Sequence, residues 1–184
     1  LRRSRGLGDV YKRQHKKNIW TLHPKEDGQR TLEADHLVLT IPSIQLLELF
    51  QRSDYELDED TMIRLRSIRH TRCLAVLGIM DRPSSLESPG TLTHPVPEID
   101  WISDNQIKGI SQKPACTIHA SDEYSQKFWN ASDSERVPSL LSIAEENLNV
   151  KIMSWSSHRW GFAKPVVTFG ATHWHSSPRG ITLA

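Results

Sequence analysis

Ala34-Asp35-His36-Leu37-Val38-Leu39-Thr40-Ile41-Pro42-Ser43 predicts a strand that is followed at once by a helix. Residues 37–41 are apolar and rich in β-branched side chains without polar alternation, which is typical of a strand covered on both faces. Pro42 cannot donate to a neighbouring strand, so we expect the strand to end there and Ser43 to cap a helix over 44–50. Ligands often bind at such strand ends in open α/β sheets, although many corners of this kind are only structural.

The segments on either side of this corner also have clear patterns. Residues 18–23 and 30–34 flank Pro24 and Asp27-Gly28, which are turn residues, and predict a hairpin that leads into the strand. A later helix is expected over 58–68, because acidic residues occupy its first turn and arginines its last turn. These charges complement the helix dipole and need no ligand to explain them.

The middle of the chain predicts strands more than helices. Residues 73–80 form a second continuous apolar run and predict a central strand, and further strands are expected at 99–103 and 115–120. Between them, residues 81–97 contain four prolines and one glycine, which indicates either a lid or a tolerated insertion. The polar residues 104–109 connect the last two strands.

The second half of the chain predicts two helices and a return to strands. A helix is expected to start at Ser121, with Tyr124 and Phe128 on one face. Residues 134–149 form the clearest amphipathic helix, with Pro138 in its first turn. Strands follow at 150–155, continuing into 156–160, and at 181–184. Strand pairs separated by helices predict an α+β fold, with a mixed, largely antiparallel sheet layered with helices.

Composition limits the class of protein. The chain has 184 residues, of which 37% are hydrophobic, and six tryptophans, enough for a substantial core. No segment approaches the ~20 apolar residues that cross a bilayer, and no secretory signal is visible, so we expect a cytoplasmic protein without a membrane partner. Cys73 and Cys116 lie in separate apolar runs and are predicted to be buried free thiols in a reducing compartment.

The basic charge of the chain is concentrated at its start. Residues 1–14 carry five Lys or Arg against Asp9, a net charge of +4, whereas the other 170 residues carry a net charge of −3. Residues 9–14 are similar to the translation of a transposase-end sequencing adapter, so we expect 1–14 not to be native. The alternative is a small α+β nucleic-acid-binding or protein-interaction module with a basic N-terminal arm.

Common catalytic and metal-binding motifs are absent from the sequence. There is no G-x-S-x-G, P-loop, H-E-x-x-H, paired C-x-x-C or G-x-G-x-x-G motif. His173 and His175 are spaced to share one face of a strand, but no cysteine or carboxylate close by completes a tetrahedral zinc site. We therefore expect no metal.

Three further segments place aromatic and hydrogen-bonding residues at strand ends. They are Trp101-Ile102-Ser103-Asp104-Asn105, Cys116-Thr117-Ile118-His119-Ala120 and His158-Arg159-Trp160-Gly161-Phe162-Ala163-Lys164-Pro165. Together with the hairpin that runs into residues 34–42, their order and spacing resemble the flavin-dependent amine oxidase superfamily, and most closely its renalase-like branch. The resemblance covers residues 15–184.

The resemblance implies an FAD enzyme of the NAD(P)-binding Rossmann superfamily with two domains. Residues 15–42 would belong to the FAD domain, 43–165 to the substrate domain, and 166–184 would return to the FAD domain. The G-x-G-x-x-G unit would precede this chain and a Gly-Asp segment would follow it, so most of the FAD site would lie outside. Such a fragment is expected to be inactive and to bind FAD weakly.

The resemblance also implies site residues and a reaction. Those expected to approach FAD are Thr40, Ile41 and Pro42; those expected in the catalytic pocket are Asn105, His119 and Trp160, with Trp101 and Arg159 as weaker candidates. A small amine or a reduced nicotinamide-type substrate would pass hydride to the flavin, and O₂ would accept the electrons, with no nucleic-acid partner. Structural alternatives stay open, since Trp160 can be core, His119 an ordinary strand residue and Asn105 a turn residue.

Overall fold

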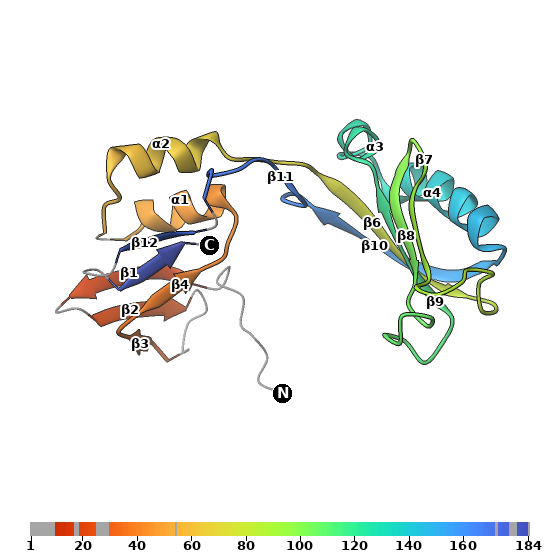
Figure 1. The fold of residues 1–184 in the computed structure, drawn as a ribbon, viewed down its shortest axis with the longest axis horizontal. Coiled ribbons are helices and arrows are strands. Elements are labelled where there is room, and N and C mark those ends of the chain that lie inside the picture. Colours follow the sequence, from red (N-terminus) through yellow and green to blue (C-terminus); the bar gives the residue numbers. More distant parts are fainter. Residues whose placement is uncertain are drawn as a thin grey trace. The chain divides into compact units, whose positions relative to one another are not determined.

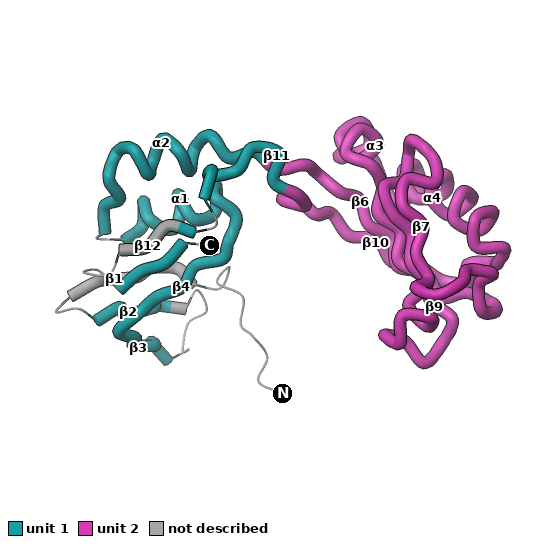
Figure 2. The backbone as a smooth tube through the Cα atoms, viewed as in Figure 1, with its two compact units in different colours: residues 1–69, 165–184 teal, residues 70–164 magenta. Residues whose placement is uncertain are grey.

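The computed structural model describes residues 10–16, 19–24, 30–53, 55–171, 173–176 and 180–183. They fall into two compact units (Figure 2). Unit 1 combines residues from 1–69 and 165–184, and unit 2 is the continuous segment 70–164. The predicted division into FAD-side and substrate-side parts, with boundaries at 42/43 and 165/166, stays a prediction. Residues 1–9 of the expected adapter and the hairpin turn at 25–29 lie outside the described residues.

The described part of unit 1 contains two small sheets and two helices (Figure 1). One sheet is an antiparallel meander in the order β1-β2-β3, which confirms the predicted hairpin. In the other, of order β12-β13-β4, strand β13 runs antiparallel to β12 and parallel to β4. The elements are β1 (Val10–Lys16), β2 (Ile19–Pro24), β3 (Leu32–Ala34), β4 (Leu37–Leu39), α1 (Ser43–Gln51), α2 (Glu59–Ser67), β12 (Trp174–Ser176) and β13 (Ile181–Leu183).

Trp20 lies at the centre of unit 1. Its side chain has no exposed surface, and its indole Nε1 donates a hydrogen bond to the Gly180 carbonyl at 2.9 Å. The amide of Leu37 donates to the same carbonyl at 2.7 Å. This one acceptor therefore fastens β2, β4 and the residue before β13, and the apolar side chains of β4, β13, α1 and α2 pack around it.

The corner after β4 differs from the prediction in two ways. The strand ends at Leu39, and Val38 is 54% exposed, so the expectation of a strand covered on both faces is wrong for the described residues. A continuous apolar run is compatible with a strand covered on one face or on both faces. Here only Leu37 and Leu39 point into the core. Ser43 is also not a cap, since α1 begins at Ser43 and Pro42 occupies the N-cap position. The Pro42 carbonyl accepts from the Leu46 amide at 2.9 Å and so starts the helix one residue early.

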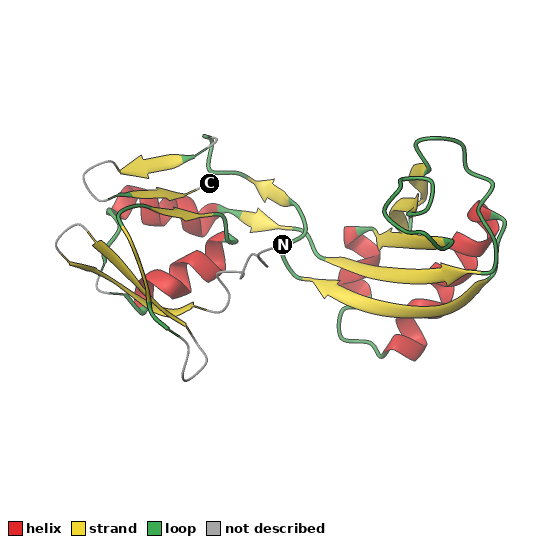
Figure 3. Ribbon diagram, turned by 90° about the horizontal axis from the view of Figure 1, so that it is seen from below, coloured by secondary structure: helices red, strands yellow, loops and turns green. Residues whose placement is uncertain are grey.

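Unit 2 is one antiparallel sheet with helices on a single face (Figure 3). The strand order is β10-β6-β9-β8-β7, with the longest strands, β6 and β10, side by side. A short pair, β11-β5, lies where the chain passes between the units. The elements of unit 2 are β6 (Cys73–Met80), β7 (Thr91–Val96), β8 (Ile99–Asp104), β9 (Ala115–Ala120), α3 (Asp122–Lys127), α4 (Asp133–Leu148) and β10 (Ile152–Trp160). The boundary between the units falls within β5 (Arg69–His70), and β11 (Pro165–Val167) belongs to unit 1.

The core of unit 2 lies between α4 and the sheet. Val137, Leu140 and Ala144 of α4 are buried against alternate residues of the strands, including Val76 and Ile118. The helix begins with a capping box formed by Ser132 and Glu135, as an amphipathic helix with a polar first turn requires. The predicted central strand, the strands at 99–103 and 115–120, and both helices of this unit are confirmed, as is the α+β fold class.

Residues 81–97 are not only a loop. Their last third forms β7, an edge strand paired with β8, with a register shift between Thr93 and Val96. Pro95 lies inside β7, and an edge strand tolerates proline because one row of its backbone groups has no partner strand. The predicted strand at 150–155, continuing into 156–160, is confirmed as β10, which pairs with β6 as far as Trp160 opposite Cys73.

Gly180→Ala is expected to destabilise unit 1 severely. Gly180 has a φ of +56°, and a Cβ there would clash with the Asp35 carbonyl oxygen, so both strain and a backbone clash oppose alanine. We expect a loss of more than about 3 kcal/mol of unfolding free energy, measured by urea denaturation and by amide exchange of Leu37. Gly170→Ala is the control, because Gly170 has a φ of +82° but nothing within 4 Å of its Cβ position, and about 1 kcal/mol is expected. Equal effects of the two variants would contradict the clash.

Candidate functional site

The sheet of unit 2 has one face that the described helices leave open. Residues directly opposite on antiparallel strands point to the same face, and neighbours along a strand point to opposite faces. Ala75 lies opposite both His119 and His158, and His119 lies opposite Trp101. The alternate residues, such as Val76, are buried under α4. We call the face of Ala75 and its partners the open face.

Asn105 lies just after β8 and is fixed on the open face by two side-chain hydrogen bonds. Its Nδ2 donates to Thr117 Oγ1 at 3.0 Å, and its Oδ1 accepts from Ser103 Oγ at 3.1 Å. Its carbonyl also accepts from the amides of Ile110 and Ser111. An amide held in this way still has one N–H and one oxygen lone pair for a ligand.

Asp104 holds the turn that positions Asn105. Its side chain has no exposed surface and accepts four hydrogen bonds: from Ser84 Oγ (2.7 Å), Ser84 N (3.4 Å), Gln106 N (2.7 Å) and Ile107 N (2.9 Å). Burial acts to raise the pKa of Asp104, but these hydrogen bonds outweigh burial and hold the pKa below its usual range. Sequence reasoning missed this residue, although an Asp at a strand end that begins a polar turn is a known signal.

Two aromatic pairs, Trp101–His119 and His158–Trp160, lie on the open face away from Asn105. The rings of Trp101 and His119 lie 5.1 Å apart, and Lys108 Nζ lies 4.6 Å from the Trp101 ring centroid. Burial, and then the nearby charge of Lys164, lower the pKa of His119, while Asp100 opposes them in part. His119 is therefore a neutral imidazole at pH 7, able both to donate and to accept a hydrogen bond.

Trp160 and Arg159 point to opposite faces of the sheet. Trp160 is 53% exposed on the open face, with its ring 4.7 Å from that of His158. Arg159 lies opposite Leu74 on the helix-covered face and donates to the Ala131 carbonyl at 3.1 Å. The structure thus brings Asn105, His119, Trp101 and Trp160 to one face and places Arg159 behind it.

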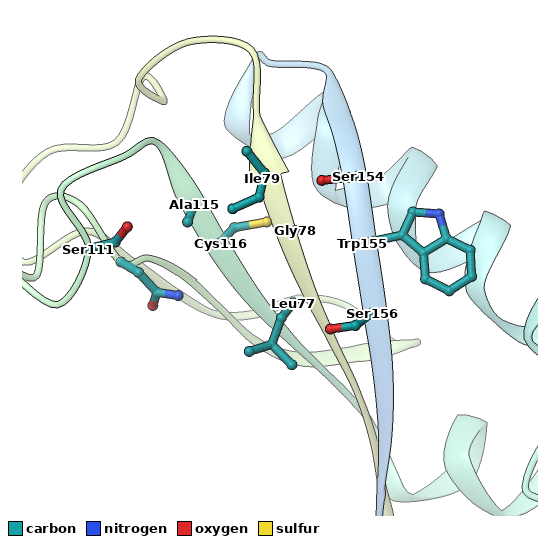
Figure 4. A pocket seen from close by; sticks show the side chains of 10 residues that line it. Leu77, Gly78, Ile79, Ser111, Ala115, Cys116, Ser154, Trp155 and Ser156 are labelled. Atoms are coloured by element: carbon teal, nitrogen blue, oxygen red, sulfur yellow. The ribbon is translucent and has the colours of Figure 1, made fainter.

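A pocket of about 400 Å³ opens between β6, β9 and β10 (Figure 4). Of the predicted catalytic residues only Asn105 borders it, so the pocket and the aromatic pairs are distinct parts of the open face. Apart from Asn105 and Cys116, the side chains that line the pocket were not candidate site residues from the sequence. Ser154 and Ser156 are spaced to share a face of a strand, which was the available signal.

The two cysteines are free and buried, as predicted. Burial raises the pKa of each thiol to about 11, so both are protonated at neutral pH and poor nucleophiles. Cys116 borders the pocket, beside Gly78.

Within the described residues no group of three or more His, Cys, Asp or Glu is placed to hold a metal ion. None of the described helices is both long and apolar enough to span a bilayer.

The three residues expected to approach FAD lie in unit 1, at the corner between β4 and α1. Thr40 is exposed, whereas Ile41 and Pro42 are half-buried. Next to them, Ser43 is 5% exposed, and its Oγ has no hydrogen-bond partner among the described residues. The first turn of α1 contains no acidic residue. The corner thus combines the N-terminus of α1, where the helix dipole is positive, with a Ser43 hydroxyl that has no hydrogen-bond partner among the described residues.

Solved structures of amine oxidases share this fold. Cyclohexylamine oxidase from Brevibacterium oxydans matches with a TM-score of 0.65 at 16% identity, over 95% of this chain and 41% of that chain. Wild-type putrescine oxidase bound to putrescine matches with a TM-score of 0.59 at 18% identity, over 88% of this chain and 36% of that chain. A fatty acid isomerase from P. acnes that produces CLA matches with a TM-score of 0.54 at 14% identity, over 88% of this chain and 36% of that chain. The sequence matches no protein-family model and no curated protein.

These likenesses confirm the predicted resemblance at the level of the fold, which is that of the FAD-dependent amine oxidases. The chain spans about two-fifths of the length of the structures it matches. The same fold also occurs in an isomerase, so the fold does not define the reaction, and any reaction must be argued from the site.

Asp104→Ala is expected to destabilise unit 2 by about 3 kcal/mol, because it removes the acceptor of four hydrogen bonds from the half-buried residues Ser84, Gln106 and Ile107. Urea denaturation measures the loss, and broadening of the Asn105 side-chain amide signals reports the released turn. Glu146→Ala, an exposed change on α4, is the control and should cost less than about 0.5 kcal/mol. The contribution of Asp104 is present above its unfolded pKa of about 3.9 and is lost as pH falls. A stable Asp104→Ala variant would contradict this role.

The lowered pKa of His119 predicts a specific pH dependence. The unfolded chain binds a proton at a pKa of about 6.5, whereas folded His119 binds it only at lower pH, so unit 2 loses stability as pH falls below about 6.5. His119→Gln should remove that part of the pH dependence, measured as unfolding free energy between pH 5 and 8. Proton NMR titration of the ring gives the pKa directly, and a value at or above 6.5 would refute the assignment.

Proposed function

We propose that the chain is part of an FAD-dependent oxidoreductase of the amine oxidase type, renalase-like in its sequence features, whose substrate lies on the open face of unit 2. The observation that carries the proposal is that one uncovered sheet face displays Asn105, His119, Trp101 and Trp160 in a fold shared with amine oxidases. The substrate would be a small amine or a reduced nicotinamide-type compound, and O₂ would be the final acceptor.

Each of these residues has a role that fits its surroundings. Trp160, half-exposed beside His158, would stack on a planar or apolar part of the substrate. Asn105 would hold a polar atom through its spare N–H or carbonyl oxygen, and neutral His119 would orient the substrate by a second hydrogen bond. Trp101 supports the His119 ring. Arg159 would be a positioning residue, since it ties β10 to Ala131 behind Trp160.

The corner in unit 1 fits a ligand rich in hydrogen-bond acceptors, such as the phosphate and ribityl part of FAD. The first amides of α1 and the buried Ser43 hydroxyl are donors without partners among the described residues, and Thr40 is accessible. FAD, when bound, supplies the two-electron acceptor for hydride leaving the substrate. Thr40, Ile41 and Pro42 would hold it, with most of the remaining contacts supplied outside this chain.

Titration of the full chain with FAD tests the cofactor part of this proposal. We expect weak binding, with ¹⁵N–¹H shifts at the amides of Thr40, Ile41 and Ser43. Ser43→Ala should weaken binding about fivefold, the value of one lost hydrogen bond. Ser53→Ala is the matched control at the other end of α1, where its hydroxyl donates to the Phe50 carbonyl at 2.9 Å, and it should leave binding unchanged.

The same samples test the inactivity of the fragment. With FAD and an amine or a dihydronicotinamide, the chain alone should consume no O₂ above the rate of free FAD, because the flavin is not held over the substrate. Shifts that spare residues 40–43, or no shifts at millimolar FAD, would overturn the cofactor assignment. A yellow chain that reduces O₂ with substrate would overturn the predicted inactivity.

A further inference from the structure

We propose that the pocket of the open face receives an uncharged, apolar group of the substrate, so that monoamines carrying an apolar ring or alkyl group are bound in preference to α,ω-diamines. This inference rests on the proposed function and names the substrate class of the same face. The pocket encloses about 400 Å³, a volume usual for sites that take part of a small ligand.

One wall of the pocket is apolar and still exposed to water. Leu77 and Ile79 are 46% and 43% exposed, and they lie two residues apart on β6, so both point to the open face. Figure 4 shows both side chains on the same side of β6, with the small Ala115 next to Ile79 on β9. Covering these side chains with an apolar group removes their surface from water, which favours binding.

The other wall is polar but uncharged. Ser156 and Ser154 lie opposite Leu77 and Ile79 on β10, and Asn105 and Ser111 border the far side. Every side chain that lines the pocket is neutral at pH 7, including the protonated thiol of Cys116. An ammonium group placed here would lose its hydration and meet no carboxylate in return, whereas an uncharged group loses little.

The carboxylates near the open face are already occupied. Asp104 has no exposed surface and accepts four hydrogen bonds. Asp100 lies 3.3 Å from Lys164 Nζ and 3.5 Å from His94 Nδ1. Burial is the largest cause that lowers the pKa of His119; the charges of Lys164 and Lys108 lower it further, and the charge of Asp100 opposes them. The second ammonium of a diamine therefore finds no favourable partner at either end.

Amide NMR titrations of the full chain at pH 7 test the inference with three probes: cyclohexanol, cyclohexylamine and 1,4-diaminobutane. We expect the two ring compounds to shift the amides of Leu77, Ile79, Ser154 and Ser156. The diamine should bind at least about tenfold more weakly at these positions. Diamine binding as tight as that of cyclohexanol, or ring compounds that leave these amides unshifted up to their solubility, would overturn the inference.

A charge placed in the pocket should reverse the preference. Ser156→Glu adds a carboxylate opposite Leu77, and we expect at least fivefold weaker cyclohexanol binding together with measurable diamine binding. Met153→Glu is the matched control, because Met153 is on the same strand, 70% exposed, and does not line the pocket. This variant should still bind cyclohexanol more tightly than the diamine, as the wild type does. If Ser156→Glu leaves the affinities for cyclohexanol and the diamine at their wild-type values, the inference is overturned.

A second variant covers the case in which Ser156→Glu does not fold. Leu77→Ser removes the apolar wall without adding charge, and it should weaken cyclohexanol binding severalfold while the amide spectrum outside β6 stays unchanged. Equal cyclohexanol affinity in Leu77→Ser and wild type would refute the apolar wall. These outcomes are separate from the test of the proposed function, since that test follows FAD at residues 40–43 of unit 1.

Discussion

The buried carboxylate of Asp104 is the interaction on which the polar end of the open face depends. A charge without exposed surface is stable only if donors surround it, and here the donors come from Ser84 and from the two amides that begin the next turn. Because that turn is fixed, Asn105 can reach Thr117 on the neighbouring strand and present its amide beside the pocket. The buried carboxylate of Asp104 thus sets the position of the neutral Asn105 side chain, a predicted site residue.

The open face is divided electrostatically along its strands. The pocket end is lined by aliphatic, hydroxyl and amide groups, whereas the other end has Lys108 over Trp101 and neutral His119 beside it. The helix-covered face provides the rigidity, through a core that α4 shares with β6 and β9. A single sheet therefore forms a packed core on one side, and its other side is the proposed substrate surface.

The elements were largely predictable from the sequence, and the faces were not. The apolar run 73–80 and the periodic helix at 133–148 depend on local patterns, so both were found. Val38 was predicted to be covered, since an apolar run does not show which residue lacks a neighbour. Arg159 and Trp160 were predicted to share a pocket, but adjacent strand residues point to opposite faces, and only the pairing with β6 shows which face each occupies. Asp104 was treated as part of a connection because one of its donors, Ser84, lies 20 residues away in the sequence.

The carbonyl of Gly180 has a consequence for the order in which the chain folds. It accepts from both Trp20 and Leu37, residues separated from it by more than 140 positions, so the core of unit 1 stays incomplete until Gly180 has been synthesised. Unit 2 is contiguous, and its strands pair with neighbours of shorter sequence separation. During synthesis the whole of unit 2 is therefore available for folding before the core of unit 1 can form, and the early strands of unit 1 keep apolar surface exposed until then.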